Sequence, residues 1–508
     1  MIKSGFLRRS AQSANTKQVQ GGATAASTIS SESGFQSAEV SSRPCSHFRM
    51  SSRFVLSQGL AAFPLLSALT LLVGCSSGSV GPGIQTAAAI PSQWVVAWGA
   101  SPENALPSSE NSGGTEQSFR FLFLPTIDGT KERVHLSNLF GTAPITIGAA
   151  RLAMATGTGP AVNPTTDTPL TFSGASSITL AAGQEVVSDP VKVPYNFGQT
   201  MAVSVYVKGA FLPLTQHDSQ VTINYASAIG AGDTTTDTAG TSFAQAVTEW
   251  YLLTGVDVYG PYQGTVAIFG SSSVDGHNSN FGDTNSYPVM NVAIPSQNND
   301  RPSDWLARQL IVAGYRLGVL NAGEIGDPAG EDSITASGSA VAGIDRMKHD
   351  VLEQAGIKTV VIYFGGIDLR SDCVSATNVE ASLTNMVSQG EAAGLRVILA
   401  TLPPSEYCMS SNPDLLPSAA NPYQGDLNPG PENPGSTQRR AVNDWIRTTG
   451  AQLPGVVAIA DFDQALAYPP HPDFMMPNFY TDDNFHPNGV GYGVQSAAIP
   501  LPSLLGSQ

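Results

Sequence analysis

Residues 265–276 read TVAIFGSSSVDG, and they set the fold of the second half of the chain. Residues 266–269 form a short apolar run, which is typical of an interior strand in a parallel sheet. Gly270 then allows a sharp turn, and three serines follow at 271–273, at the carboxyl end of the strand. Ligands bind at that edge of open α/β sheets, so a serine placed there can act as a nucleophile if the chain also supplies a base.

A base for such a serine is found near the C-terminus, in residues 481–492, TDDNFHPNGVGY. Asp483 and His486 lie three residues apart, and Pro487 follows. A nucleophilic serine needs an imidazole that takes its proton and a carboxylate that orients the imidazole, and one turn can carry both at this spacing. His277 is a rival base, but it is expected on the helix that follows the serines and has no carboxylate at the same spacing.

Strands and helices alternate between these two motifs. Ser303 and Asp304 are suited to cap the first helix, and Gly314 is suited to end it. Five strands interleaved with helices predict a parallel doubly wound α/β sheet over residues 263–505. The strands after the first are expected at 317–321, 359–364, 396–402 and 456–461. Helices are expected at 303–314, 340–354 and 438–449, and a further helix is expected to end near Gly394.

Four blocks of this region resemble those of the SGNH (GDSL-type) esterases and acylhydrolases. FGSSSVDG at 269–276 corresponds to the family's FGDSITDG, NAGEIG at 321–326 to its block with NAG, GGID at 365–368 to GxND, and DNFHP at 483–487 to DxxHP. The blocks occur in the family's order, and the resemblance covers roughly residues 264–500. It implies a flavodoxin-like parallel sheet with strand order 2-1-3-4-5.

The resemblance also implies roles for individual residues. Ser272 stands at the position of the nucleophile, His486 at that of the general base and acid, and Asp483 at that of the carboxylate that orients the histidine. Ser271 stands where the family usually has Asp, so the block is degenerate around an intact serine. The implied activity is that of a serine esterase or acylhydrolase, which works through an acyl-enzyme and needs no metal or cofactor.

The family stabilises the developing oxyanion of the ester with three donors. Two are backbone N–H groups, which carry over to Ser272 and Gly323. The third is an Asn side chain, and this position is Ile367, which has no donor. Asn278 and Arg370 are polar residues close in sequence to the motifs, and they are candidates to compensate for the missing donor.

Residues 92–262 are predicted to form an antiparallel β-sandwich. They also resemble the β-rich region that precedes the catalytic domain in one branch of the same family. In residues 201–208, MAVSVYVK, valines alternate with other residues, which predicts a half-buried strand. Residues 225–245 are expected to form a long polar loop. Further strands are expected at 133–137, 145–155 and 178–187.

Two tryptophans and two histidines in this region carry side chains that are candidates for a functional role. Trp94 and Trp98 can stack on a sugar, but a place in the core is favoured. His135 and His217 are isolated in the sequence and are interpreted as ordinary strand or loop histidines. The region shows no metal, nucleotide or catalytic motif, so it is interpreted as an accessory domain that shapes the substrate groove or binds carbohydrate.

The first 91 residues contain an export signal rather than a folded domain. Residues 1–49 are rich in Ser, Gln, Thr and Ala and are interpreted as disordered, or as lying outside the true protein, which can begin at Met50. Residues 50–75 combine a basic start, an apolar stretch and the ending LVGC, which resembles the lipobox of bacterial lipoproteins. The resemblance implies lipidation of Cys75 and a flexible tether at 76–91. The alternative is a transmembrane anchor.

Composition and cysteine content narrow the functional classes further. The formal net charge of −16 argues against nucleic acid as a partner, because phosphate binding needs a basic surface. The four cysteines form no CxxC pair, so a zinc site is not expected. Cys373 and Cys408 follow predicted strands at the same edge of the sheet. A disulfide between them is expected in an exported protein, and two unpaired cysteines are the alternative.

The sequence supports three hypotheses of function. The first is a serine esterase of the bacterial cell envelope, lipid-anchored, with small-molecule or glycan esters such as O-acetyl groups as substrates. The second is a pseudoenzyme that binds glycans or mediates adhesion at the surface, which Ile367 and Ser271 motivate. The third keeps the same active site but transfers the acyl group to an alcohol. In each case, contact with the membrane is expected only through the lipid anchor.

Overall fold

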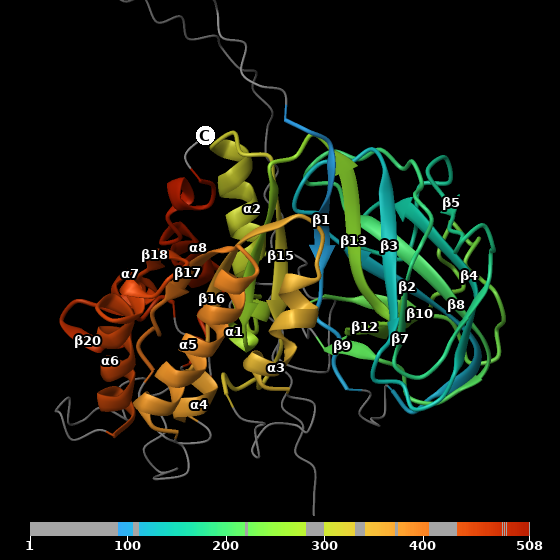
Figure 1. The fold of residues 1–508 in the computed structure, drawn as a ribbon. Helices are drawn as coiled ribbons and strands as arrows, with labels where there is room; N and C mark the ends of the chain where they lie inside the picture. Colours follow the sequence, from blue (N-terminus) through green and yellow to red (C-terminus); the bar gives the residue numbers. More distant parts are fainter. Residues whose placement is uncertain are drawn as a thin grey trace, which may run out of the picture. The chain divides into compact units, whose positions relative to one another are not determined.

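Five parallel strands form the central sheet of the second half of the chain: β14 (Gly264–Gly270), β15 (Leu317–Gly323), β16 (Ile357–Tyr363), β17 (Arg396–Ala400) and β18 (Val456–Ala460). Their order is β15-β14-β16-β17-β18, which is 2-1-3-4-5 in chain order, so the predicted flavodoxin-like sheet is confirmed (Figure 1). β14 and β15 are buried along their whole length, as expected of parallel strands covered on both faces. The computed structural model describes residues 90–104, 111–218, 222–280, 299–330, 341–370, 374–405, 434–479, 481, 483 and 485–506, all within one compact unit, Gln85–Gln508.

The helices of this half are α1 (Ser272–Asp275), α2 (Pro302–Val312), α3 (Gly343–Met347), α4 (Gly366–Arg370), α5 (Ala376–Ala392), α6 (Pro434–Arg447), α7 (Phe462–Leu466) and α8 (Gly489–Ala497). α2 packs against α8, and α5 packs against both α3 and α6 (Figure 1). A short hairpin, β19 (Ala467–Tyr468) and β20 (His471–Met475), follows α7, and 3₁₀ turns lie at Gly450–Gln452 and Leu501–Ser503.

Two helices differ in detail from the prediction. The N-cap of α2 is Arg301, and Asp304 contributes from the third helical position, where its carboxylate accepts the Arg301 N–H at 3.1 Å. The helix expected at 340–354 begins as α3 and continues as a π-helical turn over Lys348–Leu352. The extra residue in that turn re-aims the side chains that follow it, which a regular helical pattern does not predict.

Residues 92–262 form two antiparallel sheets, as predicted. The first sheet has the order β1 (Gln93–Gly99), β13 (Leu253–Gly260), β3 (Glu132–Asn138) and β7 (Gln184–Val187). The second sheet has the order β11 (Gln245–Val247), β10 (Asn224–Ala226), β2 (Gly114–Phe123), β8 (Met201–Phe211), β4 (Ile145–Met154) and β5 (Thr168–Pro169). β6 (Ile178–Leu180) also pairs with β4. β9 (Gln216–Asp218) and β12 (Glu249–Tyr251) form a separate pair.

Apolar side chains from both sheets meet in one core, which makes this region a β-sandwich. Trp98 of β1 is 2% exposed and packs against Phe123 and Trp250, so the preference for a core role holds for this tryptophan. Trp94 is only half-buried and lies on the first sheet beside Tyr259. Core residues from the two sheets include Val134, Val256, Phe121, Leu152 and Val205.

The expectation of one strand at 178–187 is wrong. The chain turns after β6, and Gly183 has φ of +79°, which a residue with a side chain rarely adopts. β6 pairs with β4 in the second sheet, whereas β7 pairs with β3 in the first. Gly183 marks the turn in the sequence, but no local pattern shows that the two short strands join different sheets.

The long polar loop expected at 225–245 is found: it runs from the end of β10 to the start of β11, and it covers a buried arginine. Arg120 of β2 donates from Nε to Ser204 Oγ at 2.8 Å and from Nη1 to the Asp237 carbonyl at 2.9 Å, and its guanidinium lies 4.1 Å from the centre of the Phe243 ring. Ser204 is therefore buried, although it alternates with the inward-facing valines of β8.

The sandwich is joined to the parallel sheet by close contacts of β1 and Thr126 with β14 and β15. Val96 N–H donates to Thr265 Oγ at 3.0 Å, and Val319 N–H donates to Thr126 Oγ at 2.9 Å. Gly318 lies so close to β1 that a Cβ there would stand 2.0 Å from the Val96 carbonyl oxygen. The two regions therefore share a packed boundary.

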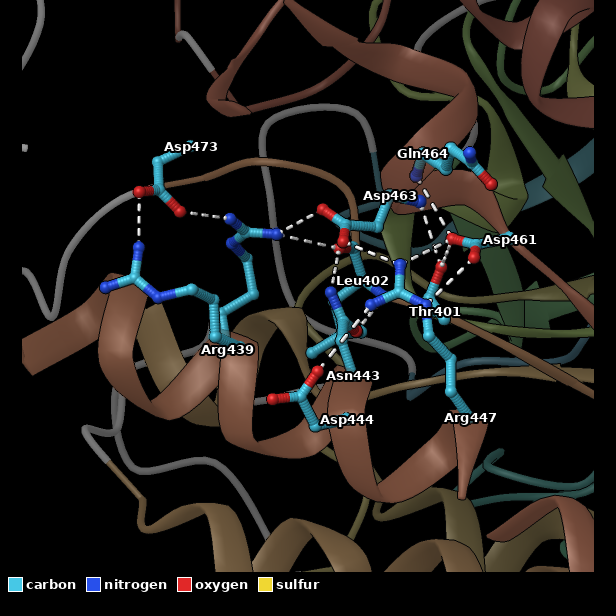
Figure 2. A network of polar contacts seen from close by, with 11 residues as sticks. Thr401, Leu402, Arg439, Asn443, Asp444, Arg447, Asp461, Asp463, Gln464 and Asp473 are labelled. Carbon is cyan, nitrogen blue, oxygen red and sulfur yellow. Dashed lines mark hydrogen bonds and ion pairs between the residues drawn. The ribbon is translucent and has the colours of Figure 1, made fainter. Parts of the chain in front are cut away.

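Charged side chains fasten α6 to the segment that leads toward the C-terminal motif (Figure 2). Arg447 donates to Asp461 at 2.7 Å and to Asp463 at 2.8 Å. Arg439, whose side chain is 3% exposed, bonds to Asp463 and donates to Asp473 of β20 at 2.7 Å. The network holds the β19–β20 hairpin, which directly precedes the catalytic motif, against α6.

Several predictions fall on residues outside the described ranges. These are the export signal at 50–75, the lipidation of Cys75 and the pairing of Cys373 with Cys408, and each stays a prediction. Among the helices that the structure does describe, none has both the length and the apolar character required to cross a membrane.

Candidate active site

The nucleophile turn is shaped by glycines at its two ends. A Cβ on Gly270 would lie 2.3 Å from the Tyr363 carbonyl oxygen, so only glycine fits at the end of β14. Gly276 ends α1 with φ of +94°. Ser272 is the first residue of α1, and its side chain is directed to the carboxyl edge of the sheet. Its N–H has no hydrogen-bond partner among the described residues, as expected at a helix N-terminus.

The structure brings Ser272, His486 and Asp483 together. Ser272 Oγ lies 2.7 Å from His486 Nε2, and His486 Nδ1 lies 2.5 Å from Asp483 Oδ2. Because a carboxylate only accepts, Nδ1 carries the proton of the neutral ring and Nε2 is left to accept the proton of the serine. This is the geometry of a Ser-His-Asp triad.

Asp483 is fixed as a permanent anion. Its Oδ1 accepts the Thr481 hydroxyl at 2.8 Å and the N–H groups of Phe485 and His486 at 2.8 and 2.9 Å. Burial alone would raise the pKa of Asp483, but the adjacent His486 and these backbone donors outweigh burial and hold the pKa well below its usual range. The carboxylate can therefore orient His486 and stabilise its protonated form.

The two residues expected to compensate for the missing donor support the catalytic loop instead. The Asn278 amide donates to Asp483 Oδ2 at 3.1 Å and to Thr481 Oγ at 3.2 Å. Arg370 donates to the Asp483 carbonyl at 3.2 Å and stacks on Phe485. Both are engaged with the segment that carries Asp483, so the expectation that they serve the oxyanion does not hold.

Gly323 also departs from its expected role. Its N–H donates to the Asn321 side chain at 3.0 Å, and a Cβ on it would lie 2.2 Å from the Asp275 backbone nitrogen. Gly323 is thus a packing glycine beneath α1, and its N–H is already used. Gly326 follows three residues later with φ of +83°, and no described residue accepts its N–H. The sequence contains both glycines, and only the contacts distinguish them.

Ile367 lies where the sequence comparison placed it. It is the second residue of α4, just after β16, and its side chain offers no donor. Asn321, in contrast, has a clear structural role, because its amide donates to the Val274 carbonyl at 2.8 Å and to Ser303 Oγ at 3.0 Å. It ties β15 to the nucleophile helix and to α2.

His277 lies beside the triad without joining it. Its ring centre is 4.6 Å from that of His486, and its Nδ1 is buried with no hydrogen-bond partner in the described part of the chain. Burial, helped by the adjacent His486, lowers the pKa of His277 to about 4, so its ring is neutral at neutral pH. Ligand atoms of His277, Asp483 and His486 lie within 4.8 Å of one another, a composition seen in metal sites. The oxygens of Asp483 already accept several N–H and O–H donors, which fits the acid of a triad better than a metal ligand.

His217 is a strand histidine of β9, as interpreted, but sequence reasoning missed its contact with the nucleophile turn. It is 2% exposed, and its Nε2 lies 3.0 Å from Asp275 Oδ1, three residues after Ser272. Its Nδ1 lies 2.8 Å from the Ser101 carbonyl. The two partners are far apart in the chain, so no local pattern signals the contact. His135 is a strand histidine, as interpreted, and pairs with Asp257 at 2.8 Å.

The fold and the site together define a hydrolase-type α/β domain with a triad at the carboxyl edge of its sheet. Residues 268–494 match the model of the GDSL-like lipase/acylhydrolase family, so this part of the chain is a domain of that family. The resemblance noted in the sequence is thereby confirmed. The comparison with curated proteins gave no match.

Solved structures similar to the chain include esterases from three bacteria. An aryl esterase from M. smegmatis is 15% identical, with 48% of this chain and 100% of that chain covered and a TM-score of 0.33. A carbohydrate acetylesterase family member from Sinorhizobium meliloti is 14% identical, with 46% and 95% covered and a TM-score of 0.32. A family two carbohydrate esterase from Clostridium thermocellum, in complex with cellohexaose, is 12% identical, with 79% and 97% covered and a TM-score of 0.32.

Proposed function

We propose that the chain is a serine esterase that cleaves carboxylic esters through an acyl-enzyme. The observation that carries the proposal is the continuous chain of short contacts from Ser272 Oγ through His486 to Asp483. A serine hydroxyl becomes a competent nucleophile only when a base lies within hydrogen-bond reach and a third group orients that base, and both conditions are met here.

In the proposed reaction Ser272 Oγ attacks the ester carbonyl carbon while its proton passes to His486 Nε2. The tetrahedral intermediate then expels the alcohol, which takes the proton from His486. Water next attacks the acyl-enzyme, gives one proton to His486, and releases the carboxylic acid as the proton returns to Ser272 Oγ. Asp483 stabilises the imidazolium that forms twice in the cycle without itself taking the proton.

The oxyanion is proposed to be held by backbone donors alone. Ser272 N–H has no competing partner within the described ranges. Gly326 N–H is a better second candidate than Gly323 N–H, because only the latter is already bonded to Asn321. Without a third donor at Ile367, catalysis is expected to be weaker, since one oxyanion donor contributes on the order of a hundred- to a thousand-fold in rate in another hydrolase.

We propose short acyl groups, such as acetyl groups of glycans or small alcohols, as the part transferred. A small pocket lies beside the nucleophile turn, lined by Ser271, Tyr363, Gly366, Leu402 and Phe485. Ser271 and Phe485 adjoin the nucleophile and the base in sequence, so the pocket lies next to the reacting atoms. Its apolar lining suits a few carbon atoms, and the alcohol side of the ester is left unspecified by these contacts.

The alternative remains a glycan-binding pseudoenzyme, and Ile367 is the observation that favours it. The experiment that separates the two assays p-nitrophenyl acetate, butyrate and octanoate with the wild type, Ser272→Ala and Ile367→Asn. We expect turnover of the short esters that Ser272→Ala abolishes. A wild type that is silent but becomes active with Ile367→Asn would instead show a lapsed catalytic site. A silent wild type that Ile367→Asn leaves silent would point to the binding function.

A further inference from the structure

His217 of the β-sandwich carries a positive charge in the interior of the protein. Its Nδ1 faces the Ser101 carbonyl at 2.8 Å and its Nε2 faces Asp275 Oδ1 at 3.0 Å. A carbonyl and an ionised carboxylate can only accept, so both ring nitrogens must donate and the ring is an imidazolium. Burial alone would lower the pKa of His217, but the charge of Asp275 outweighs burial and raises it to about 9, in agreement with the geometry.

Asp275 depends on this contact. It is the last residue of α1, the helix that begins with Ser272, and its side chain is 1% exposed. Its Oδ1 bonds His217, whereas its Oδ2 is buried without a hydrogen-bond partner in the part of the chain that the structure describes. Its backbone N–H donates to the Ser271 carbonyl at 3.1 Å, so the side chain and the nucleophile turn cannot move independently.

The surroundings leave little freedom for this pair. The Asp275 backbone is packed against Gly323 of β15, where even a Cβ would be too close. The ring of His217 lies 5.7 Å from that of Trp250, and the guanidinium of Arg301 lies 5.6 Å from the same tryptophan on its side toward α2. The turn is thus held from below by β15 and from the side by the sandwich.

We propose that His217 is a positioning residue of the esterase, which holds the nucleophile turn in place from the β-sandwich through its ion pair with Asp275. The proposal rests on the function proposed above. It makes the sandwich a working part of the active site rather than a detachable accessory. Without His217 the buried Asp275 carboxylate loses the one charged partner that it has among the described residues, and it must take a proton or turn toward water. Either change moves α1 relative to His486, and a displacement of about 1 Å can cost roughly a hundred-fold in rate.

The test compares His217→Gln, Asp275→Asn and the double variant with the wild type, each in the full-length protein. His135→Gln is the matched control, because His135 also pairs with an Asp at 2.8 Å but does so within the sandwich. For each protein the ester kcat and KM, the rate of labelling by a fluorophosphonate and the melting temperature are measured. The endpoint of labelling counts the intact active sites, so kcat is expressed per labelled site.

We expect kcat and the labelling rate of His217→Gln to fall ten- to a hundred-fold with KM within about twofold, because positioning acts on the reacting atoms. The double variant should lose less than the product of the two single losses, because a neutral amide pair replaces the ion pair. The control should keep its kcat. Values of kcat within twofold of the wild type for both single variants, whatever their melting temperatures, would overturn the proposal. If His217→Gln does not fold, Asp275→Asn decides by the same criterion, since it changes one atom.

These readouts separate the two proposals. If the wild type is active and labelled, and the His217 and Asp275 variants keep its kcat, only the positioning role is ruled out. A wild type that neither turns over esters nor is labelled at Ser272 removes the esterase function, and the positioning role with it.

Discussion

Two histidines stand side by side next to Ser272, and their contacts assign them different tasks. His486 is hydrogen-bonded to both Ser272 and Asp483, whereas Nδ1 of His277 is buried without a partner among the described residues. We expect His486→Asn to reduce kcat by roughly ten-thousand-fold, comparable to the loss of a triad member elsewhere. His277→Asn should cost far less, because its Nδ1 has no hydrogen-bond partner among the described residues and it is not bonded to Ser272.

Steady-state kinetics on p-nitrophenyl acetate checks this difference, with folding of both variants verified by circular dichroism. Equal losses in the two variants would contradict the assignment of His486 as the base. A large loss in His277→Asn alone would make His277 the base, with Asp483 then serving the loop rather than the proton transfer.

At the scale of single residues, what could be predicted depended on how local the signal is. Asp483 and His486 lie three residues apart, and Ser272 lies in a motif that ends a strand, so the sequence pattern identified all three candidates. The choice between Gly323 and Gly326 could not be made, because it depends on which N–H is already bonded. The contact of His217 was missed because its partner, Asp275, is 58 residues away in sequence.

At the scale of elements, the parallel strands were the easiest to predict. β14 is a short apolar run that ends at Gly270, and β16 is one that Gly365 follows closely, and burial on both faces leaves no competing pattern. The sandwich strands were harder, because alternation shows which face is inward but not which sheet a strand joins. β6 and β7 are the example, since they are separated by only three residues and join different sheets.

The network in Figure 2 predicts that α6 and the β19–β20 hairpin stabilise each other. Asp473→Asn removes the anion that Arg439 and Arg440 share, and leaves the buried Arg439 with Asp463 alone. Because hydrogen bonds to charged groups contribute more than neutral ones, we expect a loss of roughly 2 kcal/mol in the free energy of unfolding. Urea denaturation followed by tryptophan fluorescence measures this loss.

Asp444 is the matched control in the same network. Its side chain is 80% exposed and lies 4.0 Å from Arg447, so Asp444→Asn should change stability by no more than about 1 kcal/mol. Equal effects of the two substitutions would show that the hairpin gains nothing from the buried arginine.

At the scale of the whole described unit, the sandwich and the parallel sheet meet across a boundary that is apolar in one part and charged in another. Val96 of β1 belongs to the core of the parallel sheet, and Thr265 accepts its N–H. The charged part includes Arg346 of the α/β half, which donates to Ser101 Oγ on the sandwich side at 3.5 Å and pairs with Asp350 at 2.8 Å. Buried charges at a boundary make the fit specific, because any other docking would leave them unpaired.

Glu103 makes that boundary sensitive to pH in a direction opposite to ordinary acid denaturation. It lies 3.5 Å from His217, and burial raises the pKa of its carboxyl to about 8. The usual pKa of a Glu carboxyl is 4.5, so between pH 4.5 and about 8 Glu103 is protonated in the folded protein but ionised in the unfolded chain. The contribution of Glu103 to stability is therefore full below this pH window and is lost as the pH rises through it. Glu103→Gln imitates the protonated carboxyl at every pH.

Urea unfolding at pH 5, 6.5 and 8 should therefore show the wild type losing stability relative to Glu103→Gln as the pH rises. A difference between the two proteins that stays constant with pH would mean that Glu103 is ionised in the folded state throughout, and that His217 is neutralised by two carboxylates rather than by Asp275 alone.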